Sequence, residues 1–499
     1  MGLSLLLAAS LGVTTVFGAV FDETTVRADF STNRSSRALI DIPVRLDLSR
    51  AAGFAVDFKT GDLSQFSEFT CYLRSGDGWY NVRFAPEREG VWERIGFSMK
   101  DVRKEGTPGG LDDIATIRFA GWRAGKGDTF FAVRDFTCLD EAGLAELEKR
   151  KDRAPRPCPM PENGEFRAFW CHSARGLGKG YDWDSSIAFL KRHGYNAILA
   201  NLSWPGTAFY RSSVIPEYPG LATEGDQLEK CLAACRKHGV QCHVWKVFYN
   251  TGWAADTTAF CRQMESEGRT QVRTDREPGN KWLCPSHPKN MRQEADAMVE
   301  LAKKGVDGVH FDYIRYPGDN GCYCSGCRSR FEKRIGRRVA DWPKDLKGDG
   351  EIAVAWRKFR VDNITAVVRD VARRVRREAP GVKISAAVFQ NPETTPDSLA
   401  QDWLTWCREG FVDFVCPMNY VDSAPLQRAS TRMQLEAVRG TGVRVYPGIG
   451  LSVFKKDGCD ARRLSEQIET VRAAGAPGFT VFNFDSRAEQ ALPLISEVR

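Results

Sequence analysis

The sequence predicts two folds in one chain: an all-β sandwich of the jelly-roll type, followed by an α/β domain that is a (β/α)8 TIM barrel. Residues 20–139 are short runs of alternating hydrophobic residues broken by turns, which is typical of antiparallel strands. Residues 166–499 alternate eight β-rich runs with amphipathic helical stretches, the number and length expected of a barrel. The 499 residues also exceed what one hydrophobic core normally serves, so two domains are expected.

The first nineteen residues, MGLSLLLAASLGVTTVFGA, are small and apolar. Their length suits the core of a signal peptide, whereas the Ser, Thr and Gly residues disfavour a spanning helix. We therefore expect residues 1–19 to be a signal peptide and the protein to be periplasmic or secreted. No later stretch is long and apolar enough to predict a further transmembrane segment.

The predicted sandwich, residues 20–139, resembles the carbohydrate-binding modules that accompany polysaccharide-active enzymes. Trp79, Tyr80, Trp92 and Trp122 are candidates for stacking on sugar rings, or they fill the sandwich core. Residues 140–165 are predicted to be a linker, a helix followed by RAPRPCPMPENG. Four prolines within a dozen residues continue neither a helix nor a sheet.

The barrel prediction depends on eight β-rich runs, each followed by a helical pattern. They are FRAFWCHS from Phe166, YNAILANLSW from Tyr195, VQCHVWKVFYN from Val240, VDGVHFDYIRYP from Val306, VKISAAVFQ from Val382, FVDFVCPMNY from Phe411, VRVYPGIGL from Val443 and GFTVFNFD from Gly478. A doubly wound open sheet is the alternative. No glycine-rich phosphate loop follows the first run, which favours the barrel.

Charge gives no sign of a nucleic-acid partner. The net charge of +7 is the balance of 71 basic and 64 acidic residues. The arginine-rich stretch VRDVARRVRRE is typical of a solvated helix face, and no nucleic-acid-binding motif accompanies it. We therefore expect no nucleic-acid partner.

The fourth run, VDGVHFDYIRYP, places the carboxyl group of Asp312 where barrel enzymes carry catalytic residues. Period-two alternation puts His310 and Asp312 on one face of the strand, with Phe311 and Tyr313 on the other. Asp312 is thus expected at the top of the barrel lumen. Its alternative role is a structural salt bridge to Arg315 or Lys246.

Five stretches, FRAFWCHS, HVWKVFYN, WLCPSHP, HFDYIRYP and DFVCPMNY, resemble in order the family-ten-like glycoside hydrolases, a group with glycosyl-hydrolase-like (β/α)8 barrels. The resemblance implies action on a glycosidic bond with an acid at the end of the fourth strand, here Asp312. In barrels of the α-amylase and α-galactosidase kinds this acid is the nucleophile, and its partner comes from the fifth or sixth strand.

Glycoside hydrolysis normally needs two carboxyl groups. Asp422, after the sixth strand, and Glu393, after the fifth, are the candidates for the second, and we favour Asp422. Asp402 and Asp485 are weaker candidates. Each of these residues has the alternative role of a surface charge or a helix cap.

Other residues at predicted strand ends suit sugar binding, because a sugar pocket combines flat apolar faces with a few polar groups. The candidates are Trp170, Asn201, Trp204, Trp245, Lys246, Asn250, His310, Arg315, Asn419 and Tyr420. His172 and His243 are expected in the lumen or against helices. The six histidines lack the spacing of a catalytic zinc site, so we expect catalysis to require no cofactor.

The segment GCYCSGC places Cys322, Cys324 and Cys327 directly after the fourth strand. Three thiols this close in sequence bind a structural zinc ion with a fourth ligand, or they form a disulfide. Other cysteines, among them Cys231 and Cys235, share hydrophobic stripes and are expected in the core.

Two functions remain open from the sequence. The first is an exported glycoside hydrolase that cleaves O-glycosidic bonds of a poly- or oligosaccharide with Asp312 and a second carboxylate. The second is a catalytically inactive barrel that binds carbohydrate, because a fold alone does not establish activity.

Overall fold

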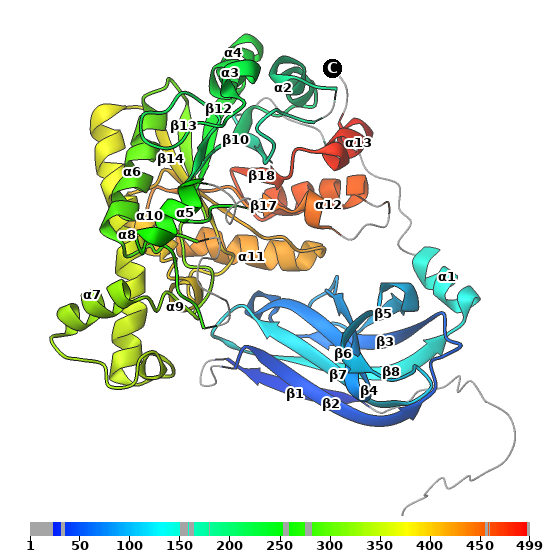
Figure 1. Ribbon diagram of the computed structural model, residues 1–499. Helices are drawn as coiled ribbons and strands as arrows, with labels where there is room; N and C mark the ends of the chain where they lie inside the picture. Colours follow the sequence, from blue (N-terminus) through cyan, green and yellow to red (C-terminus); the bar gives the residue numbers. More distant parts are fainter. Residues whose placement is uncertain are drawn as a thin grey trace, which may run out of the picture. The chain divides into compact units, whose positions relative to one another are not determined.

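The structure, a computed structural model, describes residues 23–30, 35–149, 158, 164–178, 180–252, 259–274, 282–454, 458 and 460–496. The chain divides into two compact units, Met1–Arg153 and Ala154–Arg499 (Figure 1). The expected signal peptide and most of the proline-rich segment lie outside the described residues. Within the described ranges, no helix has both the length and the apolar character needed to cross a bilayer.

The first unit is a sandwich of two four-stranded antiparallel sheets, with strand orders β1-β8-β3-β5 and β2-β7-β4-β6. Its strands are β1 (Thr24–Asp29), β2 (Arg37–Leu46), β3 (Gly53–Thr60), β4 (Phe66–Phe84), β5 (Glu93–Ser98), β6 (Arg103–Pro108), β7 (Ile114–Arg123) and β8 (Asp128–Leu139), and helix α1 (Glu141–Lys149) follows. Phenylalanines fill the space between the sheets. Phe58 of β3 meets Phe69 of β4, for example, with ring centroids 4.9 Å apart.

The four aromatic residues proposed for sugar stacking in this unit are already in contact with protein. Tyr80 is buried, and its hydroxyl donates to the carbonyl of Gly109. The three tryptophans are half-buried, each with a guanidinium group over its ring at 4.1–5.0 Å: Trp79 with Arg118, Trp92 with Arg134, and Trp122 with Arg37. Carbohydrate binding by this unit stays a prediction.

The second unit is an eight-stranded parallel barrel. Its strands are β9 (Phe166–Cys171), β10 (Ala197–Trp204), β12 (Gln241–Val247), β13 (Gly308–Asp312), β14 (Lys383–Val388), β15 (Phe414–Pro417), β16 (Arg444–Val445), β17 (Gly448–Ile449) and β18 (Gly478–Phe482). β16 and β17 are two halves of one strand on either side of Pro447, which has no backbone N–H to donate. Because β16 pairs with β15, β17 with β18, and β18 with β9, the sheet closes. The predicted fold class is confirmed.

Helices connect the barrel strands and surround the sheet (Figure 1). They are α2 (Trp183–Arg192), α3 (Leu221–Glu224), α4 (Gln227–His238), α5 (Ala259–Ser266), α6 (Pro288–Ala302), α7 (Ser325–Ile335), α8 (Glu351–Glu378), α9 (Thr395–Leu399), α10 (Trp403–Arg408), α11 (Ala424–Ala437), α12 (Asp460–Ala473) and α13 (Ser486–Ile495). A short strand, β11 (Thr207–Ala208), adds to β10 in the antiparallel direction.

Alternation along the strands separates two apolar clusters. The outward side chains pack beneath the helices, whereas the inward ones fill the barrel. The inward set is Phe166, Ala168, Trp170, Ala197, Leu199, Trp245, Val247, Ala387, Phe414, Cys416 and Tyr446. We call the end of the barrel at which the carboxyl termini of the strands lie the mouth, because loops there are free to carry function.

Candidate functional site

Asp312 is the last residue of β13 and lies at the mouth. Its side chain is buried, with the residue 6% exposed, and Oδ1 accepts the N–H of Tyr313 at 2.6 Å. Burial raises the pKa of Asp312 from 3.8 to about 6, although the charge of Arg315, the Tyr313 N–H and the Trp245 indole each lower it. Tyr313 has a φ of 54°, a conformation that non-glycine residues rarely adopt and that ends the strand directly after the acid. Asp312 is therefore poised to exchange a proton near neutral pH.

Neither expected salt-bridge partner pairs with Asp312. In the described part of the chain, no ion pair joins it to Arg315 or Lys246. Lys246 follows Trp245 on β12 and points to the opposite face, where Nζ lies 3.0 Å from Oε2 of Glu294 on α6. Both side chains of this pair are fully buried. Contrary to expectation, Lys246 does not line the mouth, because alternation turns it outward toward the helix layer.

A hydrogen-bonded floor lies on the inward faces of β9, β13 and β14. The indole Nε1–H of Trp170 donates to Nε2 of His310 at 2.9 Å, and Nδ1 of His310 lies 2.8 Å from Oγ of Ser385. His310 is fully buried, and burial lowers its pKa well below the usual range, so the ring is neutral. Trp170 and His310 were expected to bind substrate. Their polar groups instead form hydrogen bonds inside the barrel, and the two side chains lie beneath the mouth.

Partly exposed aromatic side chains gather above this floor. Tyr420 follows β15 and stacks on Phe482 of β18, with ring centroids 5.5 Å apart. The ring of Trp245, which is buried, lies 6.5 Å from that of Phe482. On β10, Trp204 donates its Nε1–H to Oδ1 of Asn201 at 2.6 Å, which fixes the orientation of the indole ring. The mouth thus offers flat apolar faces beside one carboxyl group, as carbohydrate sites do.

Arg315 forms a second side of the site. Its guanidinium group lies 4.8 Å from the rings of Tyr313 and Phe389 and 5.4 Å from that of Trp282. Asn250, another predicted residue, pairs through its backbone with Trp282 and accepts the Gly252 N–H on its side chain. Arg315 is therefore held by stacking, in the loop that leaves Asp312.

Asn419 was expected at the mouth beside Tyr420, and the structure turns it away. Its amide exchanges two hydrogen bonds with the amide of Gln434 on α11, at 3.0 and 2.6 Å, and the residue is 1% exposed. This reciprocal pair uses the polar groups of Asn419 between strand and helix, so they do not reach the mouth.

The two candidates for the second acid lie in different places. Asp422 is exposed in the loop between β15 and α11, at the mouth end of the sixth strand. Glu393 is also exposed, and it lines a pocket of about 770 Å³ together with the last turn of α11 and Thr441. These two segments precede β16, so they approach the end of the barrel opposite the mouth. The groups that shift the pKa of Asp312 include no carboxyl group from the described residues.

Asp402 and Asp485 have structural roles. Asp402 caps α10 by accepting the N–H of Thr405, and Asp485 caps α13 by accepting the N–H of Arg487. Capping is the common role of an aspartate at this position of a helix.

The cysteines that follow β13 lie beside a fourth one. The Sγ atoms of Cys322, Cys324 and Cys327 and that of Cys284, which precedes α6, all lie within 4.8 Å of one another. All four are free thiols in the structure. This donor set is able to hold a metal ion.

Sequence reasoning missed several residues of the mouth. Phe482 and Trp282 were not proposed, although the first ends the eighth strand and the second begins WLCPSHP. Tyr313 was assigned to the outer face, but with its positive φ it packs against the inward cluster as well as the outer one. His172, expected in the lumen or against a helix, is exposed beside the rings of Trp204 and Trp245.

Comparisons with known proteins bear on the second unit. The model of the family Glycosyl hydrolase-like 10 matches residues 167–456. No curated protein matches the sequence.

The solved structures that the chain is similar to include three carbohydrate-active enzymes. Alpha-L-fucosidase isoenzyme 2 from Paenibacillus thiaminolyticus is 14% identical over 66% of this chain and 48% of its own, with a TM-score of 0.46. A beta-galactosidase from Bacillus circulans sp. alkalophilus is 15% identical over 64% and 50%, with a TM-score of 0.45. An agarase is 10% identical over 92% and 88%, with a TM-score of 0.43. The chain spans about half the length of the first two.

Proposed function

The chain belongs to the Glycosyl hydrolase-like 10 family, and from this premise we propose that it is an enzyme that hydrolyses O-glycosidic bonds of an oligo- or polysaccharide. The observation that carries the proposal is the buried carboxyl group of Asp312 at the mouth, with a pKa raised to about 6. A carboxyl group with such a pKa is protonated in mildly acidic solution and loses its proton near neutral pH. Proton transfer to a glycosidic oxygen requires a group of this kind.

We assign Asp312 the role of proton donor. Burial favours the uncharged carboxyl, and a carboxyl group whose environment raises its pKa is the usual acid of a glycosidase. Asp422 is our candidate for the second carboxyl group, as nucleophile or base, because it is exposed in a mouth loop. These roles are the reverse of those in α-amylase-like barrels, where the acid of the fourth strand is the nucleophile.

The sugar is proposed to lie on the partly exposed aromatic rings of the mouth. Trp204, Tyr420 and Phe482 offer faces suited to the apolar side of a pyranose ring. Arg315 lies beside the acid and is suited to hydrogen-bond sugar hydroxyl groups. This arrangement favours a carbohydrate over a phosphorylated or strongly charged substrate, because among the described residues Arg315 alone supplies a positive charge that shifts the pKa of Asp312.

The proposal is tested with a panel of oligo- and polysaccharides, read out by reducing ends and product mass. The native protein is compared with Asp312→Asn, Asp422→Asn and Glu393→Gln. We expect Asp312→Asn to lower kcat/KM by about 10²- to 10⁴-fold, the usual contribution of a general acid, and Asp422→Asn to be similarly impaired. Glu393→Gln is the matched control and should keep native activity.

Activity that survives in Asp312→Asn would remove this residue from the reaction. Full activity in Asp422→Asn would remove only the second assignment. Sugar binding by calorimetry without turnover by the native protein would favour the alternative function, a carbohydrate-binding barrel that has kept its fold without catalysis.

A further inference from the structure

Four cysteine sulfurs meet between two loops of the barrel mouth. Cys284 follows the third strand and precedes α6, whereas Cys322, Cys324 and Cys327 follow β13. All four Sγ atoms lie within 4.8 Å of one another, with 3.4 Å between Cys284 and Cys327 and 4.0 Å between Cys284 and Cys324. Residues 38 to 43 positions apart in sequence thus bring their thiols to one point.

The sulfur separations match a tetrahedral metal site. Zinc binds thiolate sulfur at about 2.3 Å, which places the sulfurs of a tetrahedron about 3.8 Å apart. The two distances from Cys284 lie on either side of this value. A disulfide would instead require a separation of about 2.05 Å. We propose that Cys284, Cys322, Cys324 and Cys327 bind one structural zinc ion.

Backbone N–H groups are directed at two of the sulfurs. Cys324 is the N-cap of α7, and its Sγ accepts the N–H of Cys327 at 3.3 Å. The N–H of Val272 donates to Sγ of Cys322 at 3.4 Å. Such hydrogen bonds and a helix N-terminus both stabilise a thiolate over a thiol. Metal binding needs thiolates, so these contacts are the outer-shell support of a zinc site.

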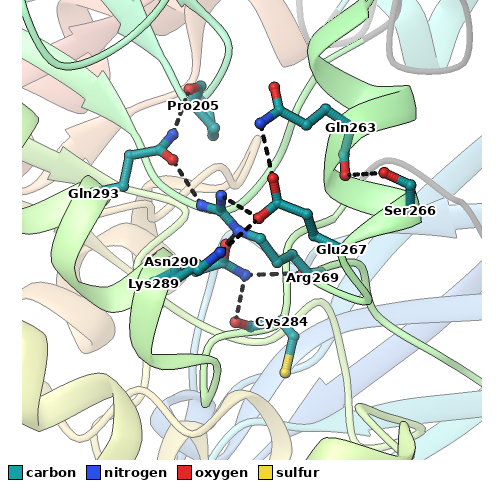
Figure 2. Close-up of polar contacts among 9 residues, drawn as sticks. All are labelled: Pro205, Gln263, Ser266, Glu267, Arg269, Cys284, Lys289, Asn290 and Gln293. Atoms are coloured by element: carbon teal, nitrogen blue, oxygen red, sulfur yellow. Dashed lines mark hydrogen bonds and ion pairs between the residues drawn. The ribbon is translucent and has the colours of Figure 1, made fainter.

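Cys284 is held in place by a buried polar network (Figure 2). The side-chain amide of Asn290 donates to the carbonyl of Cys284 at 3.0 Å and to that of Arg269 at 2.9 Å. Nε of Arg269 donates to Oδ1 of Asn290 at 2.6 Å, and the N–H of Cys284 donates to the Arg269 carbonyl. Figure 2 shows the sulfur pointing away from this network. The network fixes the backbone and leaves the thiol available as a ligand.

The ion would hold together two loops that line the mouth. It joins the loop that carries Trp282, two residues before Cys284, to the loop that carries Arg315. The guanidinium group of Arg315 stacks over Trp282, and Trp282 contacts Tyr313 beside Asp312. Zinc would thus position the groups around the acid without touching substrate. This positioning role rests on the proposed function, whereas the metal site itself does not.

A second group of thiols is the internal comparison. Cys231 and Cys235 of α4 and Cys242 of β12 also lie within 4.8 Å of one another. All three are buried, and among the described residues no fourth ligand completes the set. Three thiols packed between a helix and a strand behave as small hydrophobic groups.

The test is the metal content of the full chain, purified and dialysed, by inductively coupled plasma mass spectrometry. We expect about one zinc ion per chain, as a single four-cysteine site holds. Cys284→Ala and Cys324→Ala should both lose it, and Cys231→Ala should keep it. Cobalt added to the zinc-stripped native chain should give the charge-transfer and d–d bands of a tetrahedral tetrathiolate, which tests the site without a variant.

Three results would overturn the proposal: a native chain that is metal-free and takes up no added Zn²⁺, iron in place of zinc, or disulfides among the four cysteines by mass spectrometry. Asp312→Asn should keep its zinc. An inactive native protein that contains zinc would therefore count against the proposed function alone, and an active metal-free one against the zinc site alone.

Discussion

Two buried carboxyl groups of the barrel, Asp312 and Glu294, have opposite surroundings. Glu294 on α6 is fully buried against Lys246 of β12, with Nζ and Oε2 3.0 Å apart. Asp312 is buried almost as deeply at the end of β13, but it has no ion-pair partner among the described residues. Burial raises the pKa of both carboxyl groups.

The difference teaches where this fold tolerates an unneutralised acid. Inside the wall, between strand and helix, the charge of Glu294 is matched by a cation, because a lone buried charge is very costly. At the mouth, no ion pair among the described residues offsets the burial of Asp312, so burial raises its pKa. The paired acid is structural, and the unpaired acid is the one suited to chemistry.

Glu294→Gln removes the carboxylate that pairs with Lys246, and we expect it to have the largest effect on stability. Removing one partner leaves the charge of Lys246 buried, so we expect the free energy of unfolding to fall by about 3–5 kcal/mol. Urea unfolding followed by circular dichroism measures it. The double variant Lys246→Met with Glu294→Leu removes both charges and should restore most of the loss. Equal destabilisation in the single and double variants would contradict this explanation, because the loss would then not come from the unpaired charge of Lys246.

Asp312→Asn should act in the opposite direction. The native-state pKa is raised from 3.8 to about 6, so ionising Asp312 costs folding free energy as the pH rises through this window. One pKa unit corresponds to about 1.4 kcal/mol, which gives about 3 kcal/mol in full. The variant should therefore be more stable than the native protein at pH 8 and equal to it at about pH 3, below both pKa values. A variant that is less stable at pH 8 would contradict the unpaired state of Asp312.

The pH dependence of activity sharpens the role of the unpaired acid. A proton donor works in its protonated form, so kcat/KM should fall about tenfold per pH unit above a pKa of about 6. A rate that instead falls below pH 6 would make Asp312 the nucleophile or base. Glu393→Gln is the control, and its kcat/KM should fall above the same pH as that of the native protein.

Arg315→Met should give the smallest change. The charge of Arg315 lowers the pKa of Asp312, so removing it should move the alkaline limb of the pH profile to higher pH. Arg236→Met, an exposed arginine on α4, is the matched control. An unchanged limb in Arg315→Met would mean that Arg315 does not act on the acid electrostatically.

Much of the barrel was predictable because its signals are local. Each strand is a short β-rich run, and alternation alone put Asp312 above His310 in the lumen. Alternation also contained the answer for Lys246, which follows the inward Trp245 and must point outward. A polar residue near a strand end is nevertheless expected at the mouth, and the partner of Lys246, Glu294, lies in the next helix, where no strand pattern reveals it.

The rest depended on long-range contacts and on backbone conformation. Nothing local marks Cys284 as a neighbour of Cys322, because the two meet only when the loops after the third and fourth strands fold together. Tyr313 continues the alternation of its strand, yet its positive φ ends that strand and redirects the ring. Such turns are set by tertiary packing and have no sequence period.

The floor beneath the acid has a consequence for proton traffic. The indole of Trp170 only donates, so Nε2 of His310 must accept, and the single ring proton sits on Nδ1 toward Ser385. The Ser385 hydroxyl in turn donates to the carbonyl of Val309. Every hydrogen of this chain is committed in one direction, and the ring has no lone pair left to take another. His310 therefore does not relay a proton to Asp312, and in the proposed reaction Asp312 would regain its proton from the solvent side of the mouth.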